Sequence, residues 1–410
     1  MVKSHNIPEI KGLKYFKPLL KLLDELHFDG CQRDKAGNRK FHYDQYCLLM
    51  LLSYFDPSSR SARSLVRNSK VAKIQKRLGA GVSLASFSEA AGVFNPELIK
   101  NVANKLAEQV KPFQNVGKGH VNKKLIAVDG TVIRTLKTIA EAAYLTDKTG
   151  KTHCGWRLHT QFEIDSNVPV RIDVTSAANS GKTDEKAMLR KALMAACCYV
   201  LDRWYAQFLL FNDIVAAGSD YVCRIRDNSN LDSVTKEIDL TEAAIKSGVA
   251  RDFIVDLGVN SKPAARPDHP VRVILVKTEP HTKRGGRKGK TAGPPSDGYL
   301  RIATNMLDVP AEVIADIFRN RWAIEIFFRT FKHVLGCRHQ LSRSRAGIEI
   351  QAYCAIIACM LIAIWTGQKV TKEMFELVGM YLLGVLTERE LTNHIKKMKK
   401  KLKLKKPNCI

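Results

Sequence analysis

Residues 309–339 read VPAEVIADIFRNRWAIEIFFRTFKHVLGCRH, which is the pattern of a long amphipathic helix. Pro310 and Glu312 are typical of a first helical turn, and Gly336 is expected to end the helix after about 25 residues. With about 100° between successive residues, one face is apolar and the opposite face carries a single carboxylate among three cations. The apolar face comprises Ile317, Ile324, Phe327, Phe328, Phe331, Val334 and Leu335, and the polar face comprises Phe318, Arg321, Glu325, Arg329 and Lys332.

This polar face has two interpretations. The simpler one is a solvated helix surface, since exposed helix faces usually mix charges of both signs. Here the cations outnumber the acid and an aromatic residue begins the face. That composition favours a metal-binding carboxylate, Glu325, inside a phosphate-binding surface.

Composition narrows the class of protein. The 410 residues suffice for two or three domains, and 66 Lys and Arg against 40 Asp and Glu give a formal charge of +26. This excess favours a polyanionic partner such as nucleic acid, although ribosomal and membrane-surface proteins share it. The ten cysteines have no zinc-ligand or disulfide spacing, the N-terminus has no apolar signal segment, and the apolar run 352–365 is too short to cross a bilayer. We therefore expect a soluble, intracellular protein with buried, reduced thiols and a buried helix at 352–365.

The first 120 residues are expected to be mostly helical. Residues 43–55 have the pattern of a buried helix, and the basic stretch 58–79 precedes two glycines and a further helix from Ser83 to Val93. Short helices around a glycine turn are compatible with a helix-turn-helix DNA reader. They are equally compatible with a small bundle that has a basic exterior, and the sequence leaves both open.

From Lys123 onward the hydrophobic pattern changes from one typical of helices to one typical of strands. Residues 124–133 (KLIAVDGTVI) predict an apolar strand ending in the acid Asp129, and two alternating strands and a helix follow. Residues 198–205 (CYVLDRWY) predict a buried strand ending in the acid Asp202, after which come another helix and strand. Since ligands of open α/β sheets gather at the carboxyl ends of strands, the two acids are placed for chemistry.

The remaining segments are a strand-rich stretch and a helical end. Residues 228–309 contain three antiparallel strands and a basic, Gly/Pro-rich loop at 281–296, which is either a solvated tip or a contact to a DNA backbone. Further helices are expected to about Ile395. The eight lysines in 396–406 either bind nucleic acid or increase solubility.

Three acids from distant segments, Asp129, Asp202 and Glu325, are candidates for one shared metal site. Two divalent ions about 4 Å apart, held by shared carboxylates, can activate a water or a 3′-hydroxyl and stabilise the leaving oxygen. Hard oxygen ligands suit Mg²⁺ or Mn²⁺ better than zinc. Because clustered acids raise each other's pKa, the cluster predicts a bound metal.

The spacing Phe318-x2-Arg321-x3-Glu325-x6-Lys332 resembles the Tyr-x2-Arg-x3-Glu-x6-Lys signature of DDE transposases of the insertion-sequence-four family, with Phe in place of Tyr. The flanking sequences LIAVDGTVI, VLDRWY and LRIATNMLDVPAEVIADIFRNRW are also similar to that family. The resemblance covers roughly residues 120–365. It implies an α/β fold, an RNase H-like catalytic core interrupted by a β-strand-rich insertion, with helical N-terminal and C-terminal regions.

The resemblance also implies a division of the chain. It gives a helical N-terminal DNA-binding region (1–120), the first part of the core (121–227), the β-rich insertion (228–309), the catalytic Glu helix of the core (310–345) and a helical C-terminal region with a basic tail (346–410).

By the same resemblance, Asp129, Asp202 and Glu325 coordinate two Mg²⁺ ions, for which Mn²⁺ can substitute. Water then cuts a DNA strand at the end of the element, and the freed 3′-hydroxyl attacks target DNA or first the opposite strand. Arg321 and Lys332 would grip phosphates. Phe318 lacks the hydroxyl of the family's tyrosine, so it would pack against sugar or base. Further DNA contacts are expected from Arg203, Trp322 and Arg329.

The implied partners are double-stranded DNA, as transposon ends and target, and a second copy of the chain in a synaptic complex, in a bacterial cytoplasm at the nucleoid. Two alternatives remain open from the sequence. One is a metal-dependent nuclease that cuts without joining, and the other is a decayed or domesticated transposase that only binds DNA.

Overall fold

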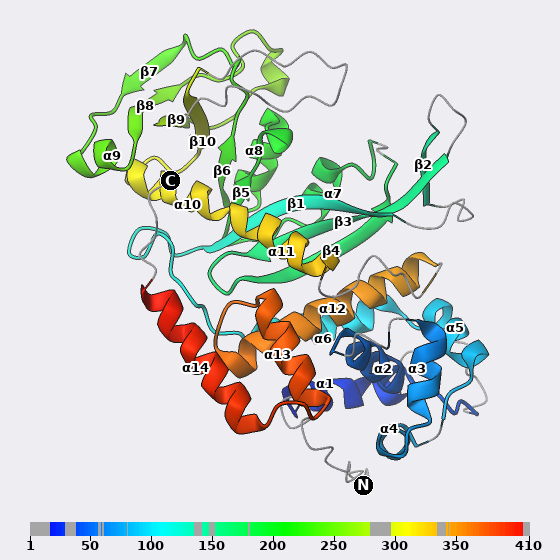
Figure 1. The fold of residues 1–410 in the computed structure, drawn as a ribbon. Helices are drawn as coiled ribbons and strands as arrows, with labels where there is room; N and C mark the ends of the chain where they lie inside the picture. The colour runs from blue at the N-terminus through cyan, green and yellow to red at the C-terminus, as the bar shows by residue number, and fades with distance from the viewer. Residues whose placement is uncertain are drawn as a thin grey trace, which may run out of the picture.

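The structure is a computed structural model that describes residues 17–28, 38–55, 59, 61–79, 81–134, 142–146, 152–178, 181–278, 297–333, 342 and 344–404. It has a mixed α/β fold. The N-terminal and C-terminal helices gather on one side of a large sheet, below it in Figure 1. The α/β class expected from the sequence is therefore confirmed.

Within the described residues, ten strands form one hydrogen-bonded sheet in the order β2-β3-β1-β5-β6-β10-β9-β8-β7, with β4 paired to β3. The central pairs β1–β5 and β5–β6 are parallel, and the other pairs are antiparallel. The sheet is thus mixed, and the strands of 228–309 extend it instead of forming a separate one. The strands are β1 (Lys124–Arg134), β2 (Ala143–Thr146), β3 (Thr152–Glu163), β4 (Val168–Ser176), β5 (Cys197–Leu201), β6 (Asp220–Arg224), β7 (Val234–Glu237), β8 (Val249–Val255), β9 (Val271–Lys277) and β10 (Tyr299–Thr304).

The sheet is covered on both faces, as its almost fully apolar central strands require. Leu125 and Ala127 of β1 belong to a core shared with the helices of the N- and C-terminal regions, whereas Ile126 and Val128 belong to a second core on the opposite face. Helices α10 (Ala311–Asn320), α11 (Trp322–His333) and α12 (Arg345–Thr366) lie on the first face, and α7 (Glu185–Lys191) and α8 (Phe208–Ala216) lie on the second (Figure 1).

The single helix expected over 310–335 is instead two helices, and this prediction is wrong. α10 ends and α11 begins on either side of Arg321, whose backbone stays in the helical region. The amides of Arg321 and Ile324 bond to the carbonyls three residues earlier, at 3.1 and 3.2 Å, which tightens this turn. The apolar face is nevertheless buried as predicted, from Ile317 to Phe331. Val334, Leu335 and Gly336 lie outside the described residues.

The N-terminal helices are α1 (Lys17–Phe28), α2 (Tyr43–Phe55), α3 (Ala62–Ser69), α4 (Ala72–Leu78), α5 (Leu84–Val93) and α6 (Pro96–Ala107). Among them α2, α5 and α6 make the main contacts with α12, which lies far away in the sequence. α12 is long and apolar enough to span a membrane, but 89% of its most apolar window is buried in the protein. Tyr54 of α2 donates to the carbonyl of Gln351 at 2.7 Å, and α6 lies beside α12 (Figure 1). The buried helix expected near 352–365 is confirmed.

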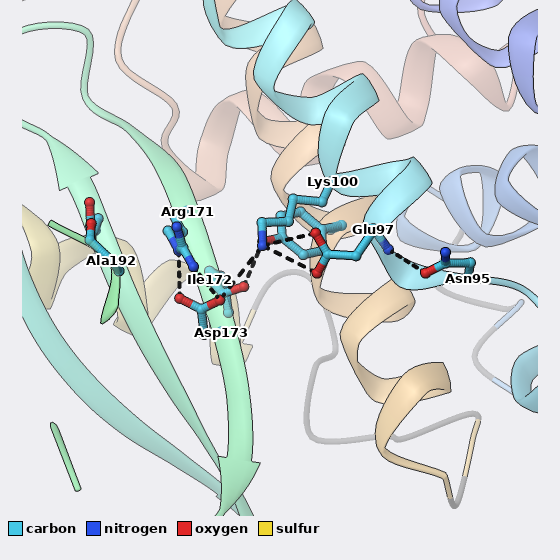
Figure 2. Close-up of polar contacts among 9 residues, drawn as sticks. Asn95, Glu97, Lys100, Arg171, Ile172, Asp173 and Ala192 are labelled. Carbon is cyan, nitrogen blue, oxygen red and sulfur yellow. Dashed lines mark hydrogen bonds and ion pairs between the residues drawn. The ribbon is translucent and has the colours of Figure 1, made fainter. Parts of the chain in front are cut away.

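A polar contact joins this helical layer to the sheet (Figure 2). Nζ of Lys100 on α6 lies 3.2 Å from a carboxylate oxygen of Glu97 and 3.9 Å from Oδ1 of Asp173 on β4. Asp173 also receives hydrogen bonds from Arg171, the closer at 2.6 Å. Asn95 caps α6 through the amide of Glu97. These contacts fix the start of α6 against β4.

Two boundaries differ from those expected. β1 does not end at Asp129 but continues to Arg134, because β3 pairs with it beyond the end of β5. The last helices are α13 (Lys372–Leu382) and α14 (Glu388–Leu404), so the helical region extends past Ile395 into the lysine-rich segment. The predicted helix from Ser83 is confirmed as α5, and every cysteine within the described part of the chain is buried and lies outside disulfide bonds. The basic loop 281–296 lies outside it.

Candidate active site

Asp129 and Asp202 are brought together by the parallel ladder between β1 and β5. The ladder runs from Lys124 paired with Cys197 to Val128 paired with Leu201. Asp129 and Asp202 are the next residues on the two strands, so the two acids are neighbours across adjacent strands. Asp202 follows β5 directly, as predicted, and precedes the short 3₁₀ turn Arg203–Tyr205.

The carboxyl group of Asp129 sits in a low-dielectric environment. Burial raises its pKa from 3.8 to about 6, and the charges of Glu185 and Glu325 act in the same direction. The amide of Gly130, which donates to Oδ1 at 2.8 Å, and the guanidinium of Arg321 oppose this shift. Glu325 is therefore within electrostatic reach of Asp129.

Glu325 is held by Arg321. Nη2 of Arg321 lies 2.8 Å from Oε1 of Glu325, and the Arg321 guanidinium carbon lies 5.7 Å from the centroid of the Phe318 ring. The charges of Arg321 and Asp202 also act, with opposite signs, on the pKa of the buried Cys223 thiol, which burial raises. Phe318, Arg321 and Glu325 thus form one cluster within electrostatic reach of Asp129.

The metal predicted from the sequence has a partial set of ligands here. Among the residues that the structure describes, no group of three or more Asp, Glu, His or Cys side chains is close enough together to hold a metal ion. The donor chemistry nevertheless fits a hard divalent cation, since two aspartates follow each other across the end of the β1–β5 ladder and carboxylate oxygens are the ligands that such ions prefer. Asp129 and Asp202 could hold such an ion, and Glu325 could join them on leaving Arg321.

Glu185 is an acid of this site that the sequence analysis missed. It begins α7 after the capping residue Asp184, and it forms an ion pair with Arg157 of β3. A Cβ atom built on Gly130 would lie only 3.0 Å from Cδ of Glu185 and would clash with its carboxylate. Glu185 therefore lies directly against the residue after Asp129. A helix after the two alternating strands was predicted, but the glycine after Asp129 was the only sign in the sequence of this approach.

The other predicted DNA contacts lie on exposed or half-buried surface. Trp322 is 51% exposed and Arg329 is also exposed, whereas Arg203 and Lys332 are half-buried. On α11 the side chains of Trp322, Glu325, Arg329 and Lys332 share one side of the helix, as their spacing dictates. A cationic surface with one exposed aromatic ring therefore surrounds Glu325.

The chain is similar to known transposases. Residues 121–361 match the family model described as "Transposase DDE domain". The chain is 25% identical over 224 residues to "Putative transposase y4zB" of Sinorhizobium fredii, which covers 52% of this chain and 56% of that protein. It is 24% identical over 253 residues to "Probable transposase for insertion sequence element IS5377" of Geobacillus stearothermophilus, covering 61% and 59%.

The chain thus spans little more than half the length of these curated relatives. Among solved structures, a cryo-EM structure titled "piggyBac transposase synaptic complex with hairpin DNA" aligns with 97% of this chain and 87% of that chain. The identity is 11% and the TM-score is 0.41.

Proposed function

The chain belongs to the DDE transposase domain family, and from this we propose that it excises and inserts an insertion sequence by phosphodiester hydrolysis and strand transfer. The observation that carries the proposal is the position of Asp129 and Asp202, neighbours at the end of the β1–β5 ladder, with Glu325 within electrostatic reach. Two-metal phosphoryl chemistry uses carboxylates that converge on the ions, and these three acids are the ones we propose for that role.

The proposed core is RNase H-like. Its support is the order of elements β1-β3-β4-α7-β5-α8-β6, with the acids at the ends of parallel pairing and α11 across the sheet. We assign residues 1–120 to an N-terminal DNA-binding region, 121–227 and 310–345 to the core, 228–309 to the insertion and 346–410 to the C-terminal region.

Asp129, Asp202 and Glu325 would hold two Mg²⁺ ions, for which Mn²⁺ can substitute. When bound, such ions supply an activated water or 3′-hydroxyl and stabilise the leaving oxygen. The chain's own residues bind and orient the DNA. Arg321 is the central one, since its guanidinium can exchange the carboxylate of Glu325 for a phosphate of similar geometry.

The surface around Glu325 is the proposed DNA-binding surface. Lys332 and Arg329 would contact phosphates, and Phe318 and Trp322 would pack against sugar or base. Arg203, directly after Asp202, would contact the phosphate nearest the second acid. This is the Tyr-Arg-Glu-Lys arrangement of the insertion-sequence-four family with Phe318 in the tyrosine position.

The proposed partners are the two ends of the element and the target DNA, all double-stranded. Because two ends must be held at once, we propose a homodimer in the synaptic complex. Its place would be a bacterial cytoplasm, at the nucleoid.

A cleavage and strand-transfer assay tests this proposal, with Mg²⁺ and duplex DNA taken from the sequences that flank the gene. Asp129→Asn, Asp202→Asn and Glu325→Gln should each reduce cleavage by at least about a hundredfold while DNA binding persists. Asp213→Asn is a matched control, since that acid is exposed and pairs with Arg190 away from the site.

The outcomes separate the alternatives. Cutting without joining would identify a nuclease. Binding without cutting, unchanged in all three variants, would identify a protein that only binds DNA and would overturn the proposal.

A further inference from the structure

A buried threonine faces the candidate active site from the neighbouring strand. Thr160 of β3 is fully buried and is paired directly with Asp129 of β1 in the antiparallel register. Directly opposite side chains in such a pair lie on the same face of the sheet, with Cβ atoms about 4.5–5.5 Å apart. The Thr160 hydroxyl is therefore a neighbour of the Asp129 carboxylate.

The surroundings of this hydroxyl are apolar. Leu158 and Phe162, the next residues of β3 on the same face, are both fully buried, and the Phe162 ring lies 5.3 Å from that of Phe327 on α11. Within the described part of the chain, Oγ1 of Thr160 has no hydrogen-bond partner. Buried hydroxyl groups almost always have a partner, so one that is unpaired calls for an explanation.

One oxygen of the Asp129 carboxylate already has a hydrogen-bond partner. Oδ1 of Asp129 accepts a hydrogen bond from the amide of the next residue, Gly130, at 2.8 Å. A carboxylate that ligates a cation through one oxygen needs a second contact to fix its orientation, and such supporting hydrogen bonds are a general feature of metal sites. Thr160 is the buried donor positioned to supply it.

We propose that Thr160 is a positioning residue for Asp129, whose hydroxyl donates a hydrogen bond to the Asp129 carboxylate when that carboxylate turns toward a divalent cation. The inference rests on the proposed function, because it presupposes a cation at this site. In the cation-free protein the hydroxyl stays unpaired and destabilises the fold, and in the loaded protein it is satisfied.

The test is Mn²⁺ binding, measured by electron paramagnetic resonance of the free ion, together with urea unfolding in the absence of metal. Thr160→Val keeps the shape of the side chain and removes the hydroxyl. It should raise the apparent Kd for Mn²⁺ about tenfold and leave the urea midpoint unchanged or higher, since an unpaired buried hydroxyl is lost. Thr160→Ser, which keeps the hydroxyl, should restore Mn²⁺ binding.

Thr366→Val is the matched control. It removes a buried hydroxyl that donates to the carbonyl of Ile362 at 2.7 Å on α12, so it should lower the urea midpoint and leave Mn²⁺ binding unchanged.

Equal Mn²⁺ affinity in wild type and Thr160→Val would overturn the inference about Thr160 and leave the proposed function standing, provided that Asp129→Asn weakens Mn²⁺ binding. If wild type binds no Mn²⁺ even with duplex DNA present, the metal site of the proposed function fails and the inference fails with it.

Discussion

Nη2 of Arg321 lies 2.8 Å from Oε1 of Glu325, and both side chains are largely shielded from solvent, at 11% and 29% exposure. The same guanidinium lowers the pKa of Asp129 against the effect of burial. Arg321 therefore pairs with Glu325 and partly offsets the effect of burial on Asp129.

If this is so, Arg321→Ala should destabilise the metal-free protein by about 1–3 kcal/mol, because Glu325 loses a charged hydrogen bond in a poorly solvated place. Mg²⁺ should stabilise this variant more than it stabilises wild type, since it replaces the missing positive charge. Urea unfolding with and without Mg²⁺ measures both effects. Arg251→Ala is the control, because its pair with Glu237 is exposed and contributes at most about 1 kcal/mol.

Asp129 should contribute to the pH dependence of the unfolding free energy. Its pKa in the folded protein is about 6, above its usual 3.8, so the folded state keeps a proton that the unfolded chain releases between these values. This contribution to stability is complete below about pH 4 and is lost as pH rises through about 6.

Asp129→Asn has no carboxyl group at this position, so its stability does not fall in this way. Without metal, the unfolding free energy of the variant relative to that of wild type should therefore rise between pH 4 and pH 7, by up to about 3 kcal/mol. If the unfolding free energies of the two proteins changed with pH in parallel, this would contradict a buried Asp129 carboxyl with a raised pKa.

Gly130→Ala should displace the ion pair of Glu185 and Arg157, because the new methyl group would occupy the place of the Glu185 carboxylate. We expect a loss of about 1–3 kcal/mol in unfolding free energy and lower cleavage activity. Glu185→Ala in the same chain should recover part of the stability, which a double-mutant cycle measures. Gly92→Ala has open space around it in α5 and should leave stability unchanged or higher by up to about 1 kcal/mol.

Lys332→Ala should weaken binding to duplex DNA and reduce the salt dependence of that binding by about one released ion. The measurement is the slope of log Kd against log salt concentration. Lys372→Ala is the matched control, since Lys372 is exposed on α13 and paired with Glu376. An unchanged slope for Lys332→Ala would argue against a phosphate contact.

The elements were more predictable from the sequence than their contacts. Alternating and continuous apolar runs predicted β3, β4 and β5, and the capping residue Ser83 predicted the start of α5, because these signals are local. The passage of β1 beyond Asp129 was not predictable, since it depends on the antiparallel partner β3.

At the candidate site, too, the local elements were predictable from the sequence and the contacts between distant segments were not. Asp202 at the end of β5 and the polar face of α11 follow from local pattern. The approach of Glu185 to Gly130 and the pairing of Thr160 with Asp129 arise only when separate segments meet in the fold. The tight turn at Arg321 also escaped prediction, because its backbone remains helical and no glycine or proline marks it.

The packing of α2, α5 and α6 against α12 has a consequence for synthesis of the protein on the ribosome. α12 begins at Arg345, so helices that emerge early, such as α2 and α6, have no finished core until most of the chain has been translated. Their apolar sides stay open to chaperones throughout that interval. A product truncated before residue 345 would keep Asp129, Asp202 and Glu325 yet leave α2, α5 and α6 without the helix that they pack against, and quality-control proteases would remove it.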